Sequence, residues 1–350
     1  MARSTTDRIT TAAAYGGAGL GAAGAMGAAL VALLIGETKL ARRRIPQADE
    51  PPPVSHDTIW AAAGVSRTRP PISLAMLGDS TAAGFGVSRD RDTPAARIAI
   101  GLSDSARRPV HVSNVAVVGA ESKQLRDQIE ALGAARPELA VIMIGANDVT
   151  HRVPLGESVR QLGDAVTQLR ARGAEVVVGT CPDLGTVRPL AQPLRLVARH
   201  LSRRLAKQQT IAVVSAGGRT VSLGDLIGPT FAARHDMFAA DRFHPSAKGY
   251  AEAADALLPS CLDVLGMRTR SRSASTFTTR LSKPIGRAAA QAAAHPGTEV
   301  AAAERHGVTA GRRGTWARLR RRQPSGPLPT SPELAVPVEV AGTGAPSGTG

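Results

Sequence analysis

The sequence is poor in cysteine and in aromatic residues. Its 350 residues include two cysteines, two tryptophans, two tyrosines and five phenylalanines. Two cysteines, Cys181 and Cys261, are too few for a disulfide scaffold or a cysteine-rich metal site. The eight histidines show no metal-ligand spacing, so we expect no metal ion. The scarcity of aromatic residues and the lack of a recognition motif argue against a specific nucleic-acid partner.

Positive charge is concentrated in the C-terminal part of the chain. The formal net charge is +15, but residues 268–350 alone hold 13 lysine and arginine residues against four acidic ones. Proline, glycine, serine and threonine are also abundant there, so we expect a basic, low-complexity and mostly disordered tail over 268–350. Within this tail, "RAAAQAAA" and "GTWARLRRRQ" are predicted to form short basic helices.

The N-terminal part, in contrast, lacks charge. No charged residue occurs from Ile9 to Gly36, and this length is sufficient to cross a bilayer as a helix. We therefore expect a membrane-spanning or signal-anchor segment over 1–45, and a membrane-associated protein. Basic residues after this segment favour a cytoplasmic position for the rest of the chain, with export as the alternative. A proline-rich linker is predicted over 46–70.

Short apolar runs alternate with amphipathic segments in the middle of the chain. The runs are rich in valine, isoleucine and leucine without polar alternation, which is typical of strands buried on both faces. Thr93 and Pro94 offer an N-cap and a first helical residue, and Ser246 begins a closing helix. This pattern predicts a three-layer α/β/α fold with a five-stranded parallel sheet in the flavodoxin-like order 2-1-3-4-5. The expected strands are Ile72–Leu77, His111–Ala116, Leu139–Ile144, Glu175–Thr180 and Thr210–Ser215.

Glycine and polar residues follow these runs at the ends of the expected strands. The first strand leads into Gly-Asp-Ser with Ser80, the second leads to Gly119, and the third ends in "GAND" with Asn147. Ligand sites of such sheets lie at the carboxyl ends of the strands, where the strand order reverses. Asp241 and His244, in "DRFHPS" before the closing helix, are expected to reach the same edge.

These residues have the chemistry needed for nucleophilic acyl transfer. Serine is a weak nucleophile unless an imidazole takes its proton, and His244 can be that base for Ser80. Asp241 can bind the other ring nitrogen of His244 and fix its tautomer. We therefore predict the catalytic residues Ser80, Asp241 and His244. The predicted oxyanion-hole donors are the backbone N–H groups of Ser80 and Gly119 and the side-chain amide of Asn147.

Four sequence blocks together resemble the SGNH hydrolase family, also called GDSL esterases and lipases. The blocks "GDS", "NVAVVGAES", "GAND" and "DRFH" occur in the family's order over residues 72–266. The resemblance implies a hydrolase domain over 71–267, hydrolysis of esters or thioesters through an acyl-serine intermediate, and no cofactor. It also implies an ester-bearing small molecule, a lipid or an acylated glycan as substrate. Thr81 stands where the family name has leucine.

Three alternatives explain less of the sequence. A nucleotide-binding loop after the first strand would need a G-x-G-x-x-G or GK[ST] motif, and that loop contains neither. The G-x-S-x-G motif of α/β-hydrolases does not occur in the chain. A non-catalytic membrane-associated adaptor, acting through the basic tail, accounts for the two ends of the chain and leaves the four blocks unexplained. His151, which follows "GAND", is predicted to be an ordinary loop residue.

Overall fold

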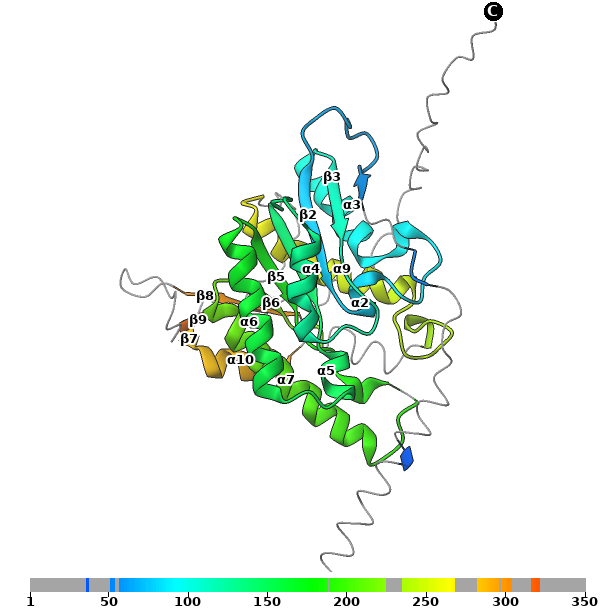
Figure 1. Ribbon diagram of the computed structural model, residues 1–350, viewed down its shortest axis with the longest axis vertical. Coiled ribbons are helices and arrows are strands. Elements are labelled where there is room, and N and C mark those ends of the chain that lie inside the picture. Colours follow the sequence, from blue (N-terminus) through cyan, green and yellow to red (C-terminus); the bar gives the residue numbers. More distant parts are fainter. Residues whose placement is uncertain are drawn as a thin grey trace, which may run out of the picture.

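The fold is an α/β arrangement in which helices cover a mixed sheet (Figure 1). The computed structural model describes residues 36–37, 51–53, 57–187, 189–224, 235–267, 282–295, 297–303 and 316–321. Within these residues the sheet has nine strands in the order β1-β3-β2-β4-β5-β6-β8-β9-β7. The strands are β1 (Asp57–Trp60), β2 (Ile72–Gly78), β3 (Val110–Asn114), β4 (Leu139–Met143), β5 (Glu175–Gly179), β6 (Arg219–Val221), β7 (Ser282–Pro284), β8 (Thr298–Ala302) and β9 (Trp316–Arg321).

The centre of the sheet is parallel and its two edges are antiparallel. Strands β3, β2, β4, β5 and β6 run parallel to one another, and their spatial order corresponds to 2-1-3-4-5 along the chain. Strand β1 pairs antiparallel with β3 at one edge, and β8, β9 and β7 extend the other edge beyond β6. The predicted order is thus present within the sheet, but the prediction that the sheet has five strands, all parallel, was wrong because it missed both antiparallel extensions.

Strand β2 shows why the central runs form buried strands. Leu74 and Met76 belong to one hydrophobic core, and Ala75 and Leu77 belong to the core on the opposite face. Successive side chains of a strand point to opposite faces, so a strand covered on both sides must be apolar at every position. Burial of each large apolar side chain contributes about 1.5–3 kcal/mol, and these contributions hold the end of β2 in a fixed position.

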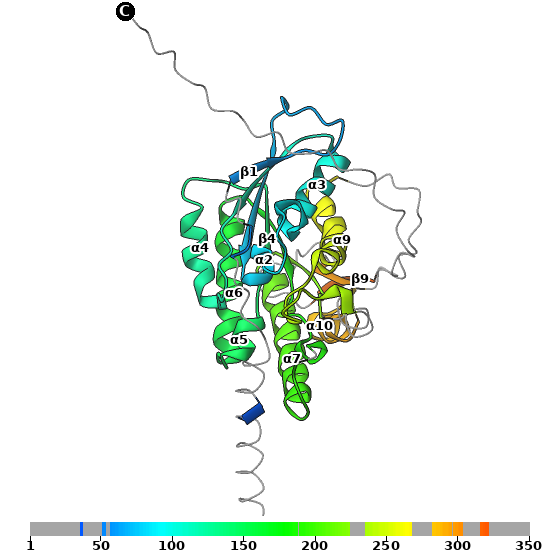
Figure 2. The same cartoon turned by 90° about the vertical axis from the view of Figure 1, so that its right-hand side faces the viewer.

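Helices cover both faces of the sheet, as Figure 2 shows. One face carries α3 (Pro94–Ala106) and α9 (Ala247–Val264), and the other carries α4 (Leu125–Ala131) and α6 (Leu155–Ala171). The Thr93 hydroxyl caps α3 and the Ser246 hydroxyl caps α9, as the sequence predicts. The remaining helices are α2 (Ser80–Ala83), α5 (Ala146–Thr150), α7 (Leu194–Ser215) and α10 (Ile285–Ala294), with 3₁₀ turns at Asp90–Asp92, Ser122–Gln124, Leu184–Thr186 and His235–Met237.

The predicted fifth strand, Thr210–Ser215, is instead the last part of the long helix α7. Val213 packs into the core beside the sheet, while Val214 packs toward α10. This end of the helix is apolar because it is buried on two sides, and a short apolar run does not distinguish a strand from a buried helix. The fifth parallel strand is β6, which has three residues and begins with Arg219.

Part of the predicted disordered tail completes the sheet. Strands β7, β8 and β9 and helix α10 all come from residues after 267, and "GTWARLRRRQ" contributes β9 rather than a helix. Charged side chains join this part to the domain: Arg219 contacts Asp263 at 2.5 Å and Glu299 at 2.7 Å, and Arg320 contacts Asp263 at 2.6 Å. Ser260 donates to the buried Glu299 carboxylate at 2.9 Å. Disorder was wrongly predicted for β7–β9 and α10. These strands pair with one another and with β6, and Asp263 and Glu299 form ion pairs with Arg320.

The predicted membrane-spanning segment and membrane localisation are not supported. Among the described residues, no helix has both the length and the apolar character required to cross a bilayer. Of the segment from Ile9 to Gly36, only Gly36 is described, so the rest of this prediction lies outside the described residues.

Candidate active site

Ser80 lies at the carboxyl end of β2, where the strand turns directly into α2. Gly78 has a φ of +136°, and a Cβ at this position would lie 1.9 Å from the Met143 carbonyl oxygen, so the turn requires glycine. The Asp79 carboxylate caps α2 by accepting from the Thr81 N–H at 2.9 Å. Ser80 therefore begins α2 at the sheet edge, and its backbone N–H is among the first-turn donors that the helix does not use.

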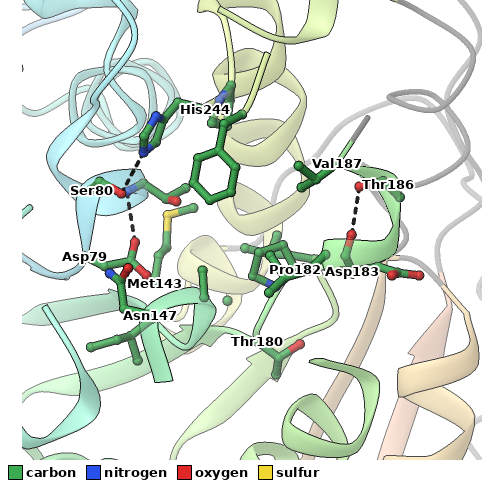
Figure 3. A pocket seen from close by; sticks show the side chains of 18 of the residues that line it. Asp79, Ser80, Met143, Asn147, Thr180, Pro182, Asp183, Thr186, Val187 and His244 are labelled. Carbon is green, nitrogen blue, oxygen red and sulfur yellow. Dashed lines mark hydrogen bonds between the residues drawn. The ribbon is translucent and has the colours of Figure 1, made fainter. Parts of the chain in front are cut away.

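The structure brings Asp241 and His244 to Ser80. His244 Nε2 lies 3.0 Å from Ser80 Oγ (Figure 3). On the other side of the ring, His244 Nδ1 lies 2.6 Å from Asp241 Oδ2. The second carboxylate oxygen of Asp241 accepts from the backbone N–H groups of Phe243 and His244, each at 2.9 Å. Burial disfavours the charged carboxylate, but these hydrogen bonds outweigh it and lower the pKa of Asp241. The aspartate is therefore held ionised against the imidazole.

Two phenylalanines hold the imidazole of His244 from different sides. The ring centroid of Phe85 lies 4.5 Å from that of His244, and the ring of Phe243 meets it edge-on at 4.8 Å. Phe85 is fixed in turn, because the buried Tyr250 hydroxyl donates to its carbonyl at 2.7 Å. Neither ring was predicted from the sequence to belong to the site. A signal was available, because the chain has only five phenylalanines. Of these, Phe85 follows "GDS" by five residues and Phe243 lies within "DRFH".

Asp79 is a buried carboxylate in the same site. Its side chain is 2 % exposed, and burial raises the pKa of Asp79 to about 6, against the opposing effects of the Thr81 hydrogen bond and the positive charge of protonated His244. Asp79 lines the same cavity as Ser80. An ionised carboxylate at this position repels a phosphate, which argues against the nucleotide-binding alternative.

Asn147 follows β4 and faces the cavity beside Ser80 (Figure 3). Its side-chain nitrogen donates to the Ala120 carbonyl at 3.0 Å, which uses one of the two N–H groups of the amide. The preceding Gly145 has a φ of +133°, and a Cβ there would lie 2.9 Å from the Cys181 side chain. The close approach of Cys181, which follows β5, therefore requires glycine at this position.

Gly119 lies in an exposed turn and is not brought to the cavity wall. Its φ of +81° is left-handed, which favours glycine. The turn is closed by the Ala120 N–H, which donates to the Val117 carbonyl at 3.1 Å, and Val117 N–H donates to the Gly78 carbonyl at 3.1 Å. Gly119 is thus connected to the site through Ala120, which Asn147 binds.

Asp148 on α5 and His151 directly after this helix bind the loop that contains Gly119. The buried carboxylate of Asp148 accepts from the Ser122 hydroxyl at 3.0 Å and from the Ser122 N–H at 3.2 Å. Burial raises the pKa of Asp148, while these hydrogen bonds oppose the increase. His151 Nδ1 lies 2.8 Å from Glu121, so the predicted loop histidine in fact binds this loop. It does not line the cavity.

Two buried glutamines fix the strand ends that carry these residues. Gln128 on α4 accepts from the Gly78 N–H at 2.8 Å and donates to the Gly78 carbonyl at 2.9 Å. Gln209 on α7 accepts from the Cys181 N–H at 2.8 Å and donates to the Ile144 carbonyl at 3.0 Å. An unpaired backbone group at these depths would cost about 1–3 kcal/mol, so each glutamine stabilises a strand end at the site. Neither glutamine stands out in the sequence, apart from its place on a helix.

The arrangement has the parts that acyl transfer requires. A hydroxyl, an imidazole and a carboxylate form one hydrogen-bonded chain, and the amide of Asn147 lines the same cavity as the hydroxyl. Among the described residues, no group of three or more histidine, cysteine, aspartate or glutamate side chains is arranged to hold a metal ion.

Known proteins resemble the chain along most of its length. A sequence profile of the GDSL-like lipase/acylhydrolase family matches residues 76–252. A GDSL-like esterase of Mycobacterium tuberculosis is 39 % identical over 339 residues, which cover 94 % of this chain and 99 % of that protein.

Solved structures with similar folds include two esterases. An acetyl-xylooligosaccharide esterase of Geobacillus stearothermophilus aligns with a TM-score of 0.46 at 18 % identity, over 59 % of this chain and 99 % of its own. The psychrotrophic esterase EstA of a Pseudoalteromonas species aligns with a TM-score of 0.44 at 16 % identity, over 55 % and 97 % of the two chains. The extent of the profile match and the identity to the mycobacterial relative, rather than these structures, show that the chain belongs to the GDSL-like lipase/acylhydrolase family.

Proposed function

We propose that this protein hydrolyses carboxylic esters through an acyl-serine intermediate formed on Ser80. Its family and its identity to a GDSL-like esterase make the chain a carboxylic ester hydrolase. The observation that carries the mechanism is the hydrogen-bonded chain from Asp241 through His244 to Ser80, with distances of 2.6 and 3.0 Å. Both distances lie within the range needed for direct proton transfer.

In the proposed acylation step, Ser80 Oγ attacks the carbonyl carbon of the ester while His244 Nε2 takes the hydroxyl proton. Asp241 holds the imidazole and stabilises its protonated form. The tetrahedral intermediate collapses, the acyl carbon–oxygen bond of the ester breaks, and His244 gives its proton to the departing alcohol. Water then attacks the acyl-serine with His244 again as base, which releases the carboxylic acid and restores Ser80.

The oxyanion of each tetrahedral intermediate requires donors near Ser80. We propose that the N–H of Ser80 and the second N–H of Asn147 supply two of them, because both residues line the cavity. Gly119 N–H is the third proposed donor, although its turn lies outside the cavity lining. A shift of this turn toward the substrate would bring the Gly119 N–H near the oxyanion. The hydrogen bond from Asn147 to the neighbouring Ala120 would let the turn and Asn147 move together.

The cavity beside Ser80 is the proposed acyl site. Its volume is about 60 Å³, and one water-sized group requires about 10–15 Å³ of such volume. The walls are mainly apolar and include Met143, Leu184, Val187, Leu223 and Phe238. A short acyl group therefore fits this cavity, and a long chain would have to extend out of it.

The test compares Ser80→Ala with the wild-type enzyme on p-nitrophenyl esters from acetate to octanoate. Loss of at least about a thousandfold in kcat is expected for Ser80→Ala, since the nucleophile is removed. The matched control is Ser66→Ala, because Ser66 is an exposed serine that does not line the cavity. Equal turnover by wild type and Ser80→Ala would refute the acyl-serine mechanism.

The alternative function, a membrane-associated adaptor acting through a basic tail, has no support in the structure. Strands β7, β8 and β9 of that tail extend the sheet, and Arg320 of β9 forms an ion pair with Asp263.

A further inference from the structure

A second cavity lies between helices α5, α6 and α7. Its volume is about 210 Å³, larger than the cavity beside Ser80, and the two cavities share no lining residue. Helix α7 packs against both α5 and α6, at the end of the domain where Figures 1 and 2 show α5 and α7. At about 10–15 Å³ for each water-sized group, this volume accommodates about a dozen or more such groups. The proposed hydrolysis at Ser80 makes no use of this space.

The walls of the second cavity are mainly apolar. They are formed by Val149, Val153, Leu155, Leu201 and Leu205. Leu201 is 41 % exposed, although it lies on a helix whose neighbouring residue Leu205 is buried. An exposed leucine on the wall of a cavity gains stabilisation when an apolar group covers it, at about 25 cal/mol for each Å² removed from water. An apolar ligand therefore suits this wall.

Two arginines, Arg152 and Arg204, line the same cavity from different elements. Arg204 belongs to α7, and Arg152 follows α5 with a left-handed φ of +62°. Within the described part of the chain neither has an ion-pair partner, whereas the nearby Arg160 and Arg203 bind Asp164 and Asp183. Two cations beside one apolar cavity favour a ligand that carries a negative charge.

Asp148 and Ser158 also line this cavity, and their polar groups are already bound within the protein. Ser122 donates twice to the Asp148 carboxylate, and its hydroxyl lies 3.2 Å from that of Ser158. The carboxylate is buried, while both arginine side chains belong to exposed residues. A ligand in the cavity would therefore meet the positive charges of Arg152 and Arg204 next to an apolar wall.

We propose that this second cavity binds a carboxylate with an unbranched apolar chain, such as decanoate. The carboxylate pairs with Arg152 and Arg204, and the chain lies against Leu201 and the other apolar side chains of the wall. Arginine suits this role because its planar guanidinium donates two parallel hydrogen bonds to a carboxylate. The site is separate from Ser80, so the proposal does not depend on the proposed hydrolysis.

Calorimetric titration of the full chain with decanoate tests the proposal. Saturable binding is expected for the wild type, with affinity at least about tenfold lower in the double variant Arg152→Gln/Arg204→Gln, since charged hydrogen bonds are removed. The double variant Arg126→Gln/Arg160→Gln is the matched control, because it removes two arginines with side chains 72 % and 64 % exposed. It should bind decanoate like the wild type. Arg204→Lys, which retains a charge, should bind more tightly than Arg204→Gln.

Three results would overturn the proposal. The first is the absence of saturable binding to the wild type. The second is equal affinity of the wild type and Arg152→Gln/Arg204→Gln, which would place decanoate elsewhere, including at the cavity beside Ser80. The third is equally tight binding of decanol, which has the same chain without the charge. Hydrolysis of a short ester by both double variants, measured in parallel, confirms that they are folded.

Discussion

Replacement of Asp79 by asparagine should stabilise the protein above the pKa of this buried carboxyl. The raised pKa means that the folded state binds the proton more tightly than the unfolded state. Each tenfold difference in proton affinity corresponds to about 1.4 kcal/mol. An increase from 3.8 to about 6 therefore costs the folded state about 3 kcal/mol once the carboxyl is ionised. Asparagine removes this cost and keeps an oxygen that can accept from the Thr81 N–H.

The expected signature is a difference that depends on pH. Below pH 3.8 the carboxyl is protonated in both states, so Asp79→Asn and wild type should have similar free energies of unfolding. As the pH rises from 3.8 to about 6, the free energy of unfolding of the variant should increase relative to that of the wild type. Above pH 6 it should be larger by about 3 kcal/mol. Urea denaturation followed by circular dichroism at several pH values measures this difference.

Asp241→Asn provides a control of opposite sign. Hydrogen bonds lower the pKa of Asp241 below 3.8, the value it takes when unfolded. Its ionised form therefore stabilises the folded state above pH 3.8, and this contribution is lost as the pH falls through the lower folded value. Asp241→Asn should thus destabilise the protein at neutral pH, with a difference that shrinks in acid. A pH-independent difference for Asp79→Asn, or the same sign for both variants, would refute the electrostatic reasoning.

Three other variants test the remaining contacts. Phe85→Leu should lower kcat by about 2- to 10-fold, since an aromatic contact contributes about 0.5–1.5 kcal/mol, and should leave KM unchanged because Phe85 does not line the cavity; a change in KM alone would contradict this role. Asn147→Ala should lower kcat by about 10²- to 10³-fold, and steady-state kinetics showing full activity would exclude it from the oxyanion hole. Glu299→Gln should lower the free energy of unfolding by about 1.5–3 kcal/mol, because it removes the buried negative charge that binds Ser260 and that Arg219 contacts together with Asp263; unchanged urea denaturation would contradict this.

The central strands and the proposed catalytic residues could be predicted because both depend on local chemistry. A strand buried on both faces must be apolar throughout, so the runs that became β2, β4 and β5 were visible in the sequence. Ser80 and Asn147 follow such runs directly, and the short spacing of Asp241 and His244 allows their contact within one turn. The position of Gly119 depends instead on how its turn packs against α5.

The rest of the fold depends on contacts between distant parts of the chain. Thr210–Ser215 resembles a strand because the apolar face of α7 meets both the sheet and α10 there. In β9, the buried Ala317 and Leu319 alternate with arginines, which is the pattern of a strand with one buried face. That alternation was present in the sequence, but its dense positive charge favoured a solvated segment. The acidic partners Asp263 and Glu299 make the strand possible, and they are far away in sequence.

The antiparallel strands that extend the sheet beyond β6 determine where this chain can be truncated without exposing a strand edge. The family profile ends at residue 252, and a chain shortened to that point would lose part of α9 and the strand that pairs with β6. The N–H and C=O groups of β6 would then be open to pairing with strands of other molecules, a common origin of aggregation. The mycobacterial relative matches nearly the whole length of this chain. Boundaries for expression, domain fusion or crystallisation should therefore follow the completed sheet rather than the limits of the catalytic motifs.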